Sequence, residues 1–391
     1  MKITRVEPIL CNSSNGKLRP WIFVKITTDA GVVGYGDCTD DMQASSVAAC
    51  VTNLGDNLVG RDPLETEKIY WFHKFRGNQA SQRAIGGIAH KAISGIDSAL
   101  YDVKGKALGV PVYQLLGGKL RDRIPLYWSH CGSFRARRAK KLGLPAVKTL
   151  DDIRRLGEQV LAEGYTALKT NIFALEDLPL PDSSSFSNGL LDRRTLRNAV
   201  AIVETFRKSV GEDVGIALDI GFTFRMGSTI ELARALEPYN LMWLETETQD
   251  WEALRTVRMS TKTPICTGQN LYTTRGFKPF LEAHAQDIIM PDISWNGLTM
   301  GKKIADMSEV YDMMFTPHNP HSPLATLISA HLCATVSNLM IMEFNRDDVP
   351  WRDDVLSSPL PIENGNLILP SGPGFGADLN EAEIAKHPPS D

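Results

Sequence analysis

The stretch VGIALDI at residues 214–220 is an apolar run typical of a buried strand, and it contains an acid, Asp219, near its end. Similar runs recur along most of the chain, with helical patterns such as residues 149–164 between neighbours. Eight candidate strands can be placed in this way, at residues 124–130, 165–171, 214–220, 241–246, 263–268, 287–292, 312–317 and 339–344. Eight strands alternating with helices predict an α/β fold, a (β/α) barrel with its polar groups at the carboxyl ends of the strands. No GxGxxG follows any of these runs, which argues against an open dinucleotide-binding sheet.

The size and charge of the chain limit its function. It has 391 residues, more than one hydrophobic core usually holds, so we expect a second structural unit beside the barrel. Its formal net charge of -4 provides no basic surface for nucleic acid. The apolar stretch at the amino terminus is too short for a signal-peptide core or a spanning helix, so we expect a cytoplasmic protein with no membrane partner. The 6 cysteines lack CxxC spacing, so neither a zinc site nor a disulfide framework is expected.

Residues 1–122 are predicted to form an α+β domain that precedes the barrel. Alternating runs at residues 3–10 and 21–27 flank a polar loop, as in an antiparallel hairpin. Residues 84–108 place apolar side chains at helical spacing, and the GGK sequence at 117–119 is predicted to stop the helix.

The barrel domain is expected to span residues 123–355. A long loop rich in Pro and Ser, residues 172–192, follows the second strand, where a lid over an active site would lie. Residues 356–391 are turn-rich, with one short strand signal. We expect this carboxyl-terminal segment to return to the α+β domain.

Acidic residues end two consecutive strands, and a polar segment ends the next. Asp219 and Glu245 are these acids, and TGQN around Gln269 follows them. Adjacent parallel strands lie about 4.8 Å apart, so the side chains can converge on one ion. Oxygen ligands suit Mg²⁺ or Mn²⁺. Side-chain alternation adds Glu247 as a further candidate, although acids at strand ends can also cap helices or face solvent.

A histidine and an aspartate end two other neighbouring strands. His318 follows the run at 312–317, and Asp292 ends the run before it. A carboxylate beside an imidazole raises its basicity and selects its tautomer, so this pair is a candidate general base. His321 and Asn319 are predicted to contact the substrate or to support the base. The alternative is that His318 is an ordinary hydrogen-bonded loop histidine.

Lys169 and Asn171 end the second strand and are predicted to face the same mouth. A lysine inside a barrel is costly unless it meets an anion, so Lys169 should contact a carboxylate of the substrate or the protein. Glu343 ends the eighth strand. It is either a protonated donor to a developing enolate oxygen or a partner in an ion pair across the mouth.

Several segments resemble the enolase superfamily, and within it the mandelate racemase subgroup. They are residues 24–37 (VKITTDAGVVGYGD), 92–119 (AISGIDSALYDVKGKALGVPVYQLLGGK), the barrel motifs, and 369–376 (LPSGPGFG), so the resemblance covers nearly the whole chain. The segments LEPYNLMWLE (236–245) and TPHNPHSPLA (316–325) are most similar to acid-sugar dehydratases of the galactonate dehydratase kind.

The resemblance implies a Mg²⁺-dependent lyase that abstracts the proton α to the carboxylate of a sugar acid and then eliminates water. Its metal positions fall on Asp219, Glu245 and Gln269, and its base on His318 with Asp292. By the same resemblance, Lys169 contacts the substrate carboxylate and Glu343 takes the electrophilic position, in a modified (β/α) barrel under an α+β capping domain built from both chain ends. Asn171, at the same mouth as Lys169, is a candidate substrate contact. The family forms dimers to octamers, so a homo-oligomer is expected.

Three departures from the family pattern bear on the reaction. Gln269 replaces a usual carboxylate, so weaker metal binding is expected, unless Glu247 or Asn270 compensates. Asn171 stands where the racemases place a second lysine, which argues against racemisation. Gly221 stands where galactonate-type dehydratases place a histidine that protonates the leaving group. His318 would then act twice, or the lid would supply the acid.

Two alternatives to dehydration stay open. An isomerase or cycloisomerase of the same subgroup, acting on a sugar acid or lactone, would use the same base and metal. A non-catalytic homologue would account for Gln269 and Gly221, although His318, Asp292, Lys169 and Asp219 are all present.

Overall fold

The predicted apolar runs form parallel strands in the computed structural model, which describes residues 1–13, 20–40, 42–75, 86–180 and 188–389. The strands are β4 (Arg123–Trp128), β5 (Ala167–Asn171), β6 (Gly215–Asp219), β7 (Trp243–Glu245), β8 (Ile265–Thr267), β9 (Ile288–Ile289), β10 (Met314–Phe315) and β11 (Met342–Phe344). Neighbours pair in chain order from β4 to β10, and β11 pairs with β4. A bridge between Phe315 and Leu339, just before β11, closes the ring. The predicted barrel is confirmed.

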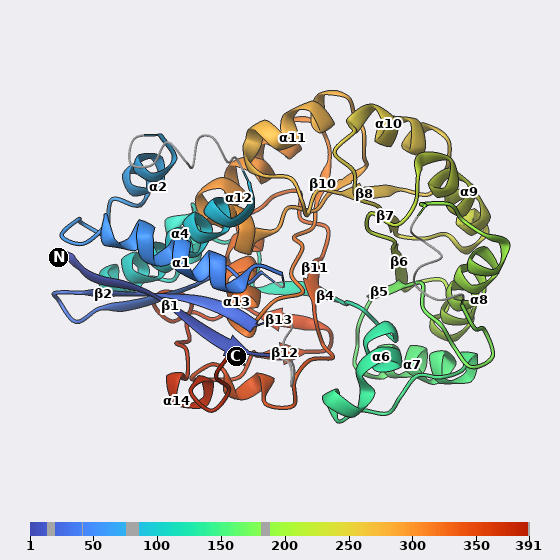
Figure 1. Ribbon diagram of the computed structural model, residues 1–391, viewed down its shortest axis with the longest axis horizontal. Coiled ribbons are helices and arrows are strands. Elements are labelled where there is room, and N and C mark those ends of the chain that lie inside the picture. Colours follow the sequence, from blue (N-terminus) through green and yellow to red (C-terminus); the bar gives the residue numbers. More distant parts are fainter. Residues whose placement is uncertain (14–19, 41, 76–85, 181–187, 390–391) are drawn as a thin grey trace.

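Helices connect the strands and lie on the outside of the barrel (Figure 1). They are α6 (Ser133–Leu142), α7 (Leu150–Ala162), α8 (Arg193–Val210), α9 (Met226–Leu236), α10 (Trp251–Met259), α11 (Thr273–Glu282), α12 (Ile293–Val310) and α13 (Pro323–Cys333). The helix predicted at 149–164 is α7, and it begins after Thr149, whose hydroxyl accepts the Asp152 N–H in a capping box. The loop predicted as a lid has no helix or strand at residues 172–180 and 188–192, and residues 181–187 lie outside the described part.

The amino-terminal region forms an antiparallel sheet with helices, as the alternating runs predicted. Its strands are β1 (Ile3–Asn12), β2 (Pro20–Thr28) and β3 (Val33–Asp37), in the order β1-β2-β3. Its helices are α1 (Ala44–Asp56), α2 (Thr66–Phe75), α4 (Gly87–Leu108) and α5 (Val112–Leu115). Helix α4 joins this region to barrel helix α12, because Ser94 Oγ donates to Ile293 O at 3.0 Å and Thr299 Oγ1 donates to Asp97 Oδ1 at 2.7 Å.

The helix predicted to stop at residues 117–119 stops earlier. Helix α4 ends at Leu108, where Gly109 has a φ of 68° and its N–H reaches back to the last turn. A glycine in this left-handed conformation ends helices commonly, and Pro111 two residues later prevents continuation. The prediction that GGK ends this helix was therefore wrong, because Gly109 and Pro111 end it at Leu108.

The carboxyl-terminal segment contacts both the barrel and the amino-terminal region. Two short strands, β12 (Ile362–Glu363) and β13 (Asn366–Ile368), form a hairpin, and β13 pairs with the start of β4. Further on, Phe375 N–H donates to Asp102 Oδ1 of α4 at 3.0 Å. Glu381, the first residue of α14 (Glu381–Ile384), forms an ion pair with Lys25 of β2 at 2.7 Å. The fold class, a modified barrel with an α+β cap, is confirmed, and the domain limits at 122 and 355 stay predictions.

No helix within the described ranges has the length and apolar character that a membrane span requires.

Candidate active site

The carboxyl ends of the barrel strands carry polar side chains above an apolar plug. The plug consists of interior residues from the barrel strands and their ends: Tyr127, Ala167, Ala217, Trp243, Cys266, Ile288, Met290 and Ile341. Because side chains alternate along a strand, the residue two positions further on faces the same interior. In most strands that position is polar, and the residues are Ser129, Lys169, Asp219, Glu245, Asp292 and Glu343. The alternation therefore creates a polar mouth above a barrel interior that apolar side chains close.

His318 and Asp292 lie together, and His321 joins them. Asp292 Oδ2 is 2.7 Å from His318 Nδ1 and 2.6 Å from His321 Nε2. Asp292 Oδ1 accepts the Trp295 N–H at 3.0 Å, so the same carboxylate caps α12. Burial alone would raise the pKa of Asp292, but the two imidazoles outweigh it and lower the pKa. The carboxylate is thus ionised and holds His318 by Nδ1.

Two residues that the sequence did not single out support this pair. The Trp295 ring lies 5.8 Å from the His318 ring and 5.7 Å from the His321 ring, between centroids. Its Nε1–H donates to Thr39 O at 2.8 Å. Lys91 Nζ of α4 lies 3.7 Å above the Trp295 ring, a cation–π contact. Thr39 and Lys91 belong to the capping region, so this region fixes the position of Trp295 beside the two imidazoles.

Lys169 contacts two carboxylates of the protein. Its Nζ lies 3.0 Å from Glu245 Oε2 and 2.7 Å from Glu343 Oε1, and all three side chains are buried. Burial raises the pKa of Glu245, and Lys169 offsets only part of this rise. Burial alone would also raise the pKa of Glu343, but Lys169 outweighs it and holds that pKa well below its usual range. Of the two predictions for Glu343, this arrangement favours the ion pair. A carboxyl group whose pKa is lowered is ionised, so Glu343 cannot act as the protonated hydrogen-bond donor.

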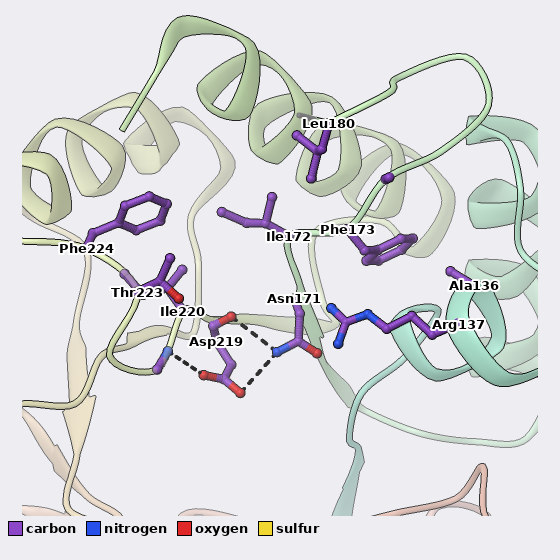
Figure 2. A pocket seen from close by; sticks show the side chains of 12 residues that line it. Ala136, Arg137, Asn171, Ile172, Phe173, Leu180, Asp219, Ile220, Thr223 and Phe224 are labelled. Atoms are coloured by element: carbon purple, nitrogen blue, oxygen red, sulfur yellow. Dashed lines mark hydrogen bonds between the residues drawn. The ribbon is translucent and has the colours of Figure 1, made fainter. Parts of the chain in front are cut away.

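Asp219 and Asn171 line a cavity at the mouth. They are partners on adjacent strands, and Asn171 Nδ2 donates to Asp219 Oδ2 at 3.1 Å. Asp219 Oδ1 accepts the Gly221 N–H at 2.9 Å. The cavity has a volume of about 720 Å³, and Arg137 of α6 also lines it. Figure 2 shows the Arg137 guanidinium directed towards Asn171, a feature that no pattern in the sequence indicated.

The other candidate ligands lie around the end of β8. Glu247 Oε1 accepts the Thr267 hydroxyl at 3.1 Å and the Gly268 N–H at 3.0 Å, and its Oε2 accepts Asn270 Nδ2 at 3.3 Å. Burial raises the pKa of Glu247, and these donors offset part of the rise. Gln269 is half-buried, and its side chain makes no hydrogen bond within the part of the chain that the structure describes.

The two predicted substrate contacts next to the base face the protein instead. Asn319 is buried, its N–H donates to Glu343 Oε2 at 2.7 Å, and its Nδ2 donates to Glu343 O at 3.1 Å. His321 is buried against Asp292. Asn319 therefore holds Glu343 through its backbone N–H, and His321 holds Asp292 through Nε2.

A third histidine near the mouth, His130, was missed in the sequence, where it looked like the last residue of a strand. His130 follows β4, and its Nδ1 lies 2.9 Å from Ser129 Oγ. The same Ser129 hydroxyl donates to Glu343 Oε1. The signal that could have revealed His130 is its place two residues beyond the end of an interior strand.

The acidic side of the mouth fits a divalent cation. Asp219 and Glu245 are paired in register on neighbouring strands. Three carboxylates, those of Asp219, Glu245 and Glu343, face one ammonium, that of Lys169. Buried negative charge without a partner is unfavourable, and oxygen ligands suit hard cations. Among His, Cys, Asp and Glu of the described residues, the trio with ligand atoms within 4.8 Å is Asp292, His318 and His321. The two histidines lie at hydrogen-bond distance from Asp292, so these contacts are hydrogen bonds within the protein.

A closed barrel with a base, a buried lysine and a carboxylate pair at one mouth defines a β/α-barrel enzyme. Residues 152–383 match the family described as enolase C-terminal domain-like, and residues 2–117 match the mandelate racemase / muconate lactonizing enzyme N-terminal domain. The chain therefore belongs to the mandelate racemase / muconate lactonizing enzyme family of the enolase superfamily, whose members typically bind a divalent metal.

Relatives with curated names are sugar-acid dehydratases. The chain is 34% identical to D-galactonate dehydratase of Ralstonia nicotianae over 98% of this chain and 94% of that protein. It is 32% identical to D-xylonate dehydratase of Haloferax volcanii over 94% of this chain and 85% of that protein. A candidate L-alanine-DL-glutamate epimerase from Burkholderia xenovorans, solved with magnesium and fumarate bound, matches with a TM-score of 0.93 at 36% identity, covering 100% of this chain and 96% of that one.

Proposed function

We propose that the protein is a Mg²⁺-dependent sugar-acid dehydratase. It would remove the proton α to the substrate carboxylate and eliminate water across the neighbouring carbon. The names of the curated relatives support this reaction. The observation that carries the proposal is the 2.7 Å contact between His318 and Asp292, at a mouth that also holds Lys169, Asp219 and Glu245.

His318 is the proposed base. Because Asp292 is ionised, it accepts the Nδ1–H of His318, which leaves Nε2 of the neutral ring to take the α proton. The same carboxylate then stabilises the imidazolium that forms. His321 and Trp295 fix Asp292 from behind, so the ring is held in one orientation before the substrate arrives.

Asp219, Glu245 and Gln269 are the proposed ligands of Mg²⁺, or of Mn²⁺. When bound, the cation supplies positive charge that stabilises the enediolate formed by proton removal. Lys169 adds a second positive charge, because the carboxylates of Glu245 and Glu343 keep its pKa above the usual value even though burial acts to lower it.

Gln269 is a better third ligand than Glu247 or Asn270. Both carboxylate oxygens of Glu247 already accept hydrogen bonds from the end of β8, and Asn270 donates to Glu247. The Gln269 amide has no such bond within the described residues, so its oxygen is available. An amide oxygen carries no net charge, and weaker metal binding than with a third carboxylate is the expected consequence.

The cavity beside Asp219 is the proposed substrate pocket. Asn171 and Arg137 bring polar groups to it, and Ile172, Phe173 and Phe224 bring apolar ones. A few directed polar groups in a largely apolar pocket orient a small ligand. We propose that Asn171 and Arg137 bind hydroxyl or carboxylate groups of the sugar acid.

An isomerase is the second candidate, because the Burkholderia xenovorans structure described as a candidate epimerase matches the whole chain. Epimerisation needs acid and base on opposite faces of one carbon. Across the mouth from His318, Lys169 is engaged by two buried carboxylates, and Asn171 offers no base. These contacts support dehydration.

The test is incubation with Mg²⁺ in D₂O and a panel of D-galactonate, D-xylonate and D-gluconate, followed by NMR. A dehydratase forms a 2-keto-3-deoxy acid with deuterium at C3. An isomerase exchanges the α proton and forms an epimer without a ketone. If neither occurs with any acid while the protein binds Mg²⁺, the proposal fails. The His318→Asn variant is the control that links either reaction to this base.

We further propose that the enzyme works in the cytoplasm, an expectation that rests on the short apolar stretch at its amino terminus, and as a homo-oligomer, an expectation that rests on the family resemblance. Size-exclusion chromatography with light scattering measures the assembly directly, and a monomer at micromolar concentration would contradict it.

A further inference from the structure

Elimination of water needs a proton for the departing hydroxyl as well as a base for the α proton. We propose that His130, at the carboxyl end of β4, donates that proton through Nε2. This inference rests on the proposed dehydratase function and adds a second catalytic residue to it. It assigns proton removal and leaving-group protonation to two different imidazoles.

The backbone of the fold holds His130 at the mouth. The Ser129 N–H donates to Phe344 O of β11 at 2.9 Å, and the Cys131 N–H donates to Lys169 O of β5 at 2.8 Å. His130 between them has a φ of 52°, in the left-handed region that side chains other than Gly rarely adopt. Such a conformation persists only when the surroundings impose it, and it occurs often at functional sites.

His130 is linked through Ser133 to Asn171, which lines the proposed substrate cavity. Ser133 Oγ of α6 contacts His130 O at 3.2 Å and donates to Asn171 Oδ1 at 2.7 Å. Asn171 lines the cavity beside Asp219. The His130 ring stacks on Phe134 with centroids 4.2 Å apart, and the side chain is half-buried. The ring is thus positioned by α6, the helix that also brings Arg137 to the cavity.

The hydrogen bonds of Ser129 select the tautomer of His130. The single hydroxyl hydrogen of Ser129 goes to Glu343 Oε1, so Ser129 Oγ must accept from His130 Nδ1–H at 2.9 Å. The transferable proton of a protonated ring is then the one on Nε2. The Glu343 carboxylate stabilises that imidazolium through Ser129, much as Asp292 stabilises His318. Each imidazole is therefore held at Nδ1, His130 by Ser129 with Glu343 behind it and His318 by Asp292.

The other cationic and imidazole groups at the mouth are engaged by carboxylates of the protein. The Lys169 ammonium lies between Glu245 and Glu343. His321 is buried against Asp292. His318 is already engaged as the base.

The atoms balance in the proposed sequence. His318 Nε2 takes the α proton, and the electrons of the C–H bond form a C2–C3 double bond as the C3–O bond breaks. The His130 Nε2 proton joins the departing oxygen, and water leaves. The enol hydroxyl then returns a proton to His130, and His318 delivers its proton to C3, which gives the 2-keto-3-deoxy acid.

The test compares two leaving groups in the His130→Asn enzyme, since Asn tolerates a positive φ. The substrates are the sugar acid of the panel that wild type dehydrates fastest and its 3-deoxy-3-fluoro analogue, whose fluoride leaves without a proton. We expect elimination of water to fall by roughly 10²-fold or more. Fluoride elimination and exchange of the α proton in D₂O should stay within about threefold of wild type, since a three-fold change corresponds to under 1 kcal/mol. His284→Asn is the matched control, because His284 has a φ of 45° and follows α11 at the opposite end of the barrel.

Two outcomes would overturn the assignment. One is water elimination within about tenfold of wild type, below the usual effect of a general acid. The other is an equal loss of water and fluoride elimination in a folded variant, since this indicates a structural role. If His130→Asn does not fold, His130→Gly repeats both measurements, because Gly adopts a positive φ without strain. Failure of the dehydratase proposal itself is distinct, since wild type would then eliminate nothing from any acid.

Discussion

The two halves of the mouth are built differently. The base half, defined as Asp292, His318 and His321, is buried, and its one carboxylate meets two imidazoles. The metal half, defined as Asp219, Glu245, Glu247 and Gln269, has three carboxylates. Within the described residues, Glu245 is the one of these three that contacts a cationic side chain, Lys169, and it shares that lysine with Glu343.

This contrast shows which half the polypeptide completes by itself. In the base half, the imidazoles lower the pKa of Asp292 although burial acts to raise it. In the metal half, burial raises the pKa values of Glu245 and Glu247, and the neighbouring donors offset only part of the rise. Buried charge without a partner is costly, so the metal half is arranged for a cation from outside.

The largest effect is expected from His318→Asn. Removal of the base should lower kcat by roughly 10³- to 10⁴-fold, because no other group in the base half is placed to take the α proton. Mg²⁺ affinity, measured by isothermal titration calorimetry, should stay unchanged. A parallel loss of Mg²⁺ binding would show that the two halves do not act independently.

A smaller loss is expected from Asp292→Asn, about 10²-fold in kcat. The amide leaves at least one imidazole without its charged acceptor, and it no longer stabilises a protonated His318. Exchange of the α proton in D₂O should fall by the same factor, because the amide no longer stabilises the imidazolium that proton removal forms. Exchange at the wild-type rate would mean that Asp292 acts only as the cap of α12.

The barrel and most of the mouth could be predicted because the sequence repeats one local pattern. Each apolar run such as VGIALDI ends beside a polar residue, and strand alternation puts Asp219 and its counterparts on one face. His318 and Asp292 were predicted in the same way, since they end neighbouring strands. These inferences need only local periodicity and the order of the strands.

Contacts between distant segments could not be read in this way. The Lys91–Trp295 contact joins the cap to the barrel, and no spacing pattern in the sequence indicates it. His130 was hidden because its positive φ turns the ring back to Ser129, which a strand pattern does not reveal. Asn319 was assigned to the substrate because of its place beside His318, although its amide faces Glu343.

Mg²⁺ is expected to stabilise the folded protein through the metal half. A ligand that binds the native state alone adds about 2.7 kcal/mol to the free energy of unfolding at a concentration of about 100 times Kd. Urea unfolding with and without Mg²⁺ measures this gain. It should disappear in Asp219→Asn and persist in His318→Asn. A gain that survives Asp219→Asn would place the cation elsewhere.

The smallest effect tests the third ligand. Gln269→Glu should tighten Mg²⁺ binding by about tenfold, equivalent to roughly 1.4 kcal/mol, because a carboxylate replaces a neutral amide at a site that already has oxygen ligands. Gln249→Glu is the matched control, because it adds the same charge at an exposed position in the loop after β7. If both variants tighten binding equally, the gain comes from net charge and Gln269 does not ligate the metal. If Gln269→Glu alone does so, the metal half binds through the ends of three successive strands, and the native amide keeps its affinity below the maximum that the fold allows.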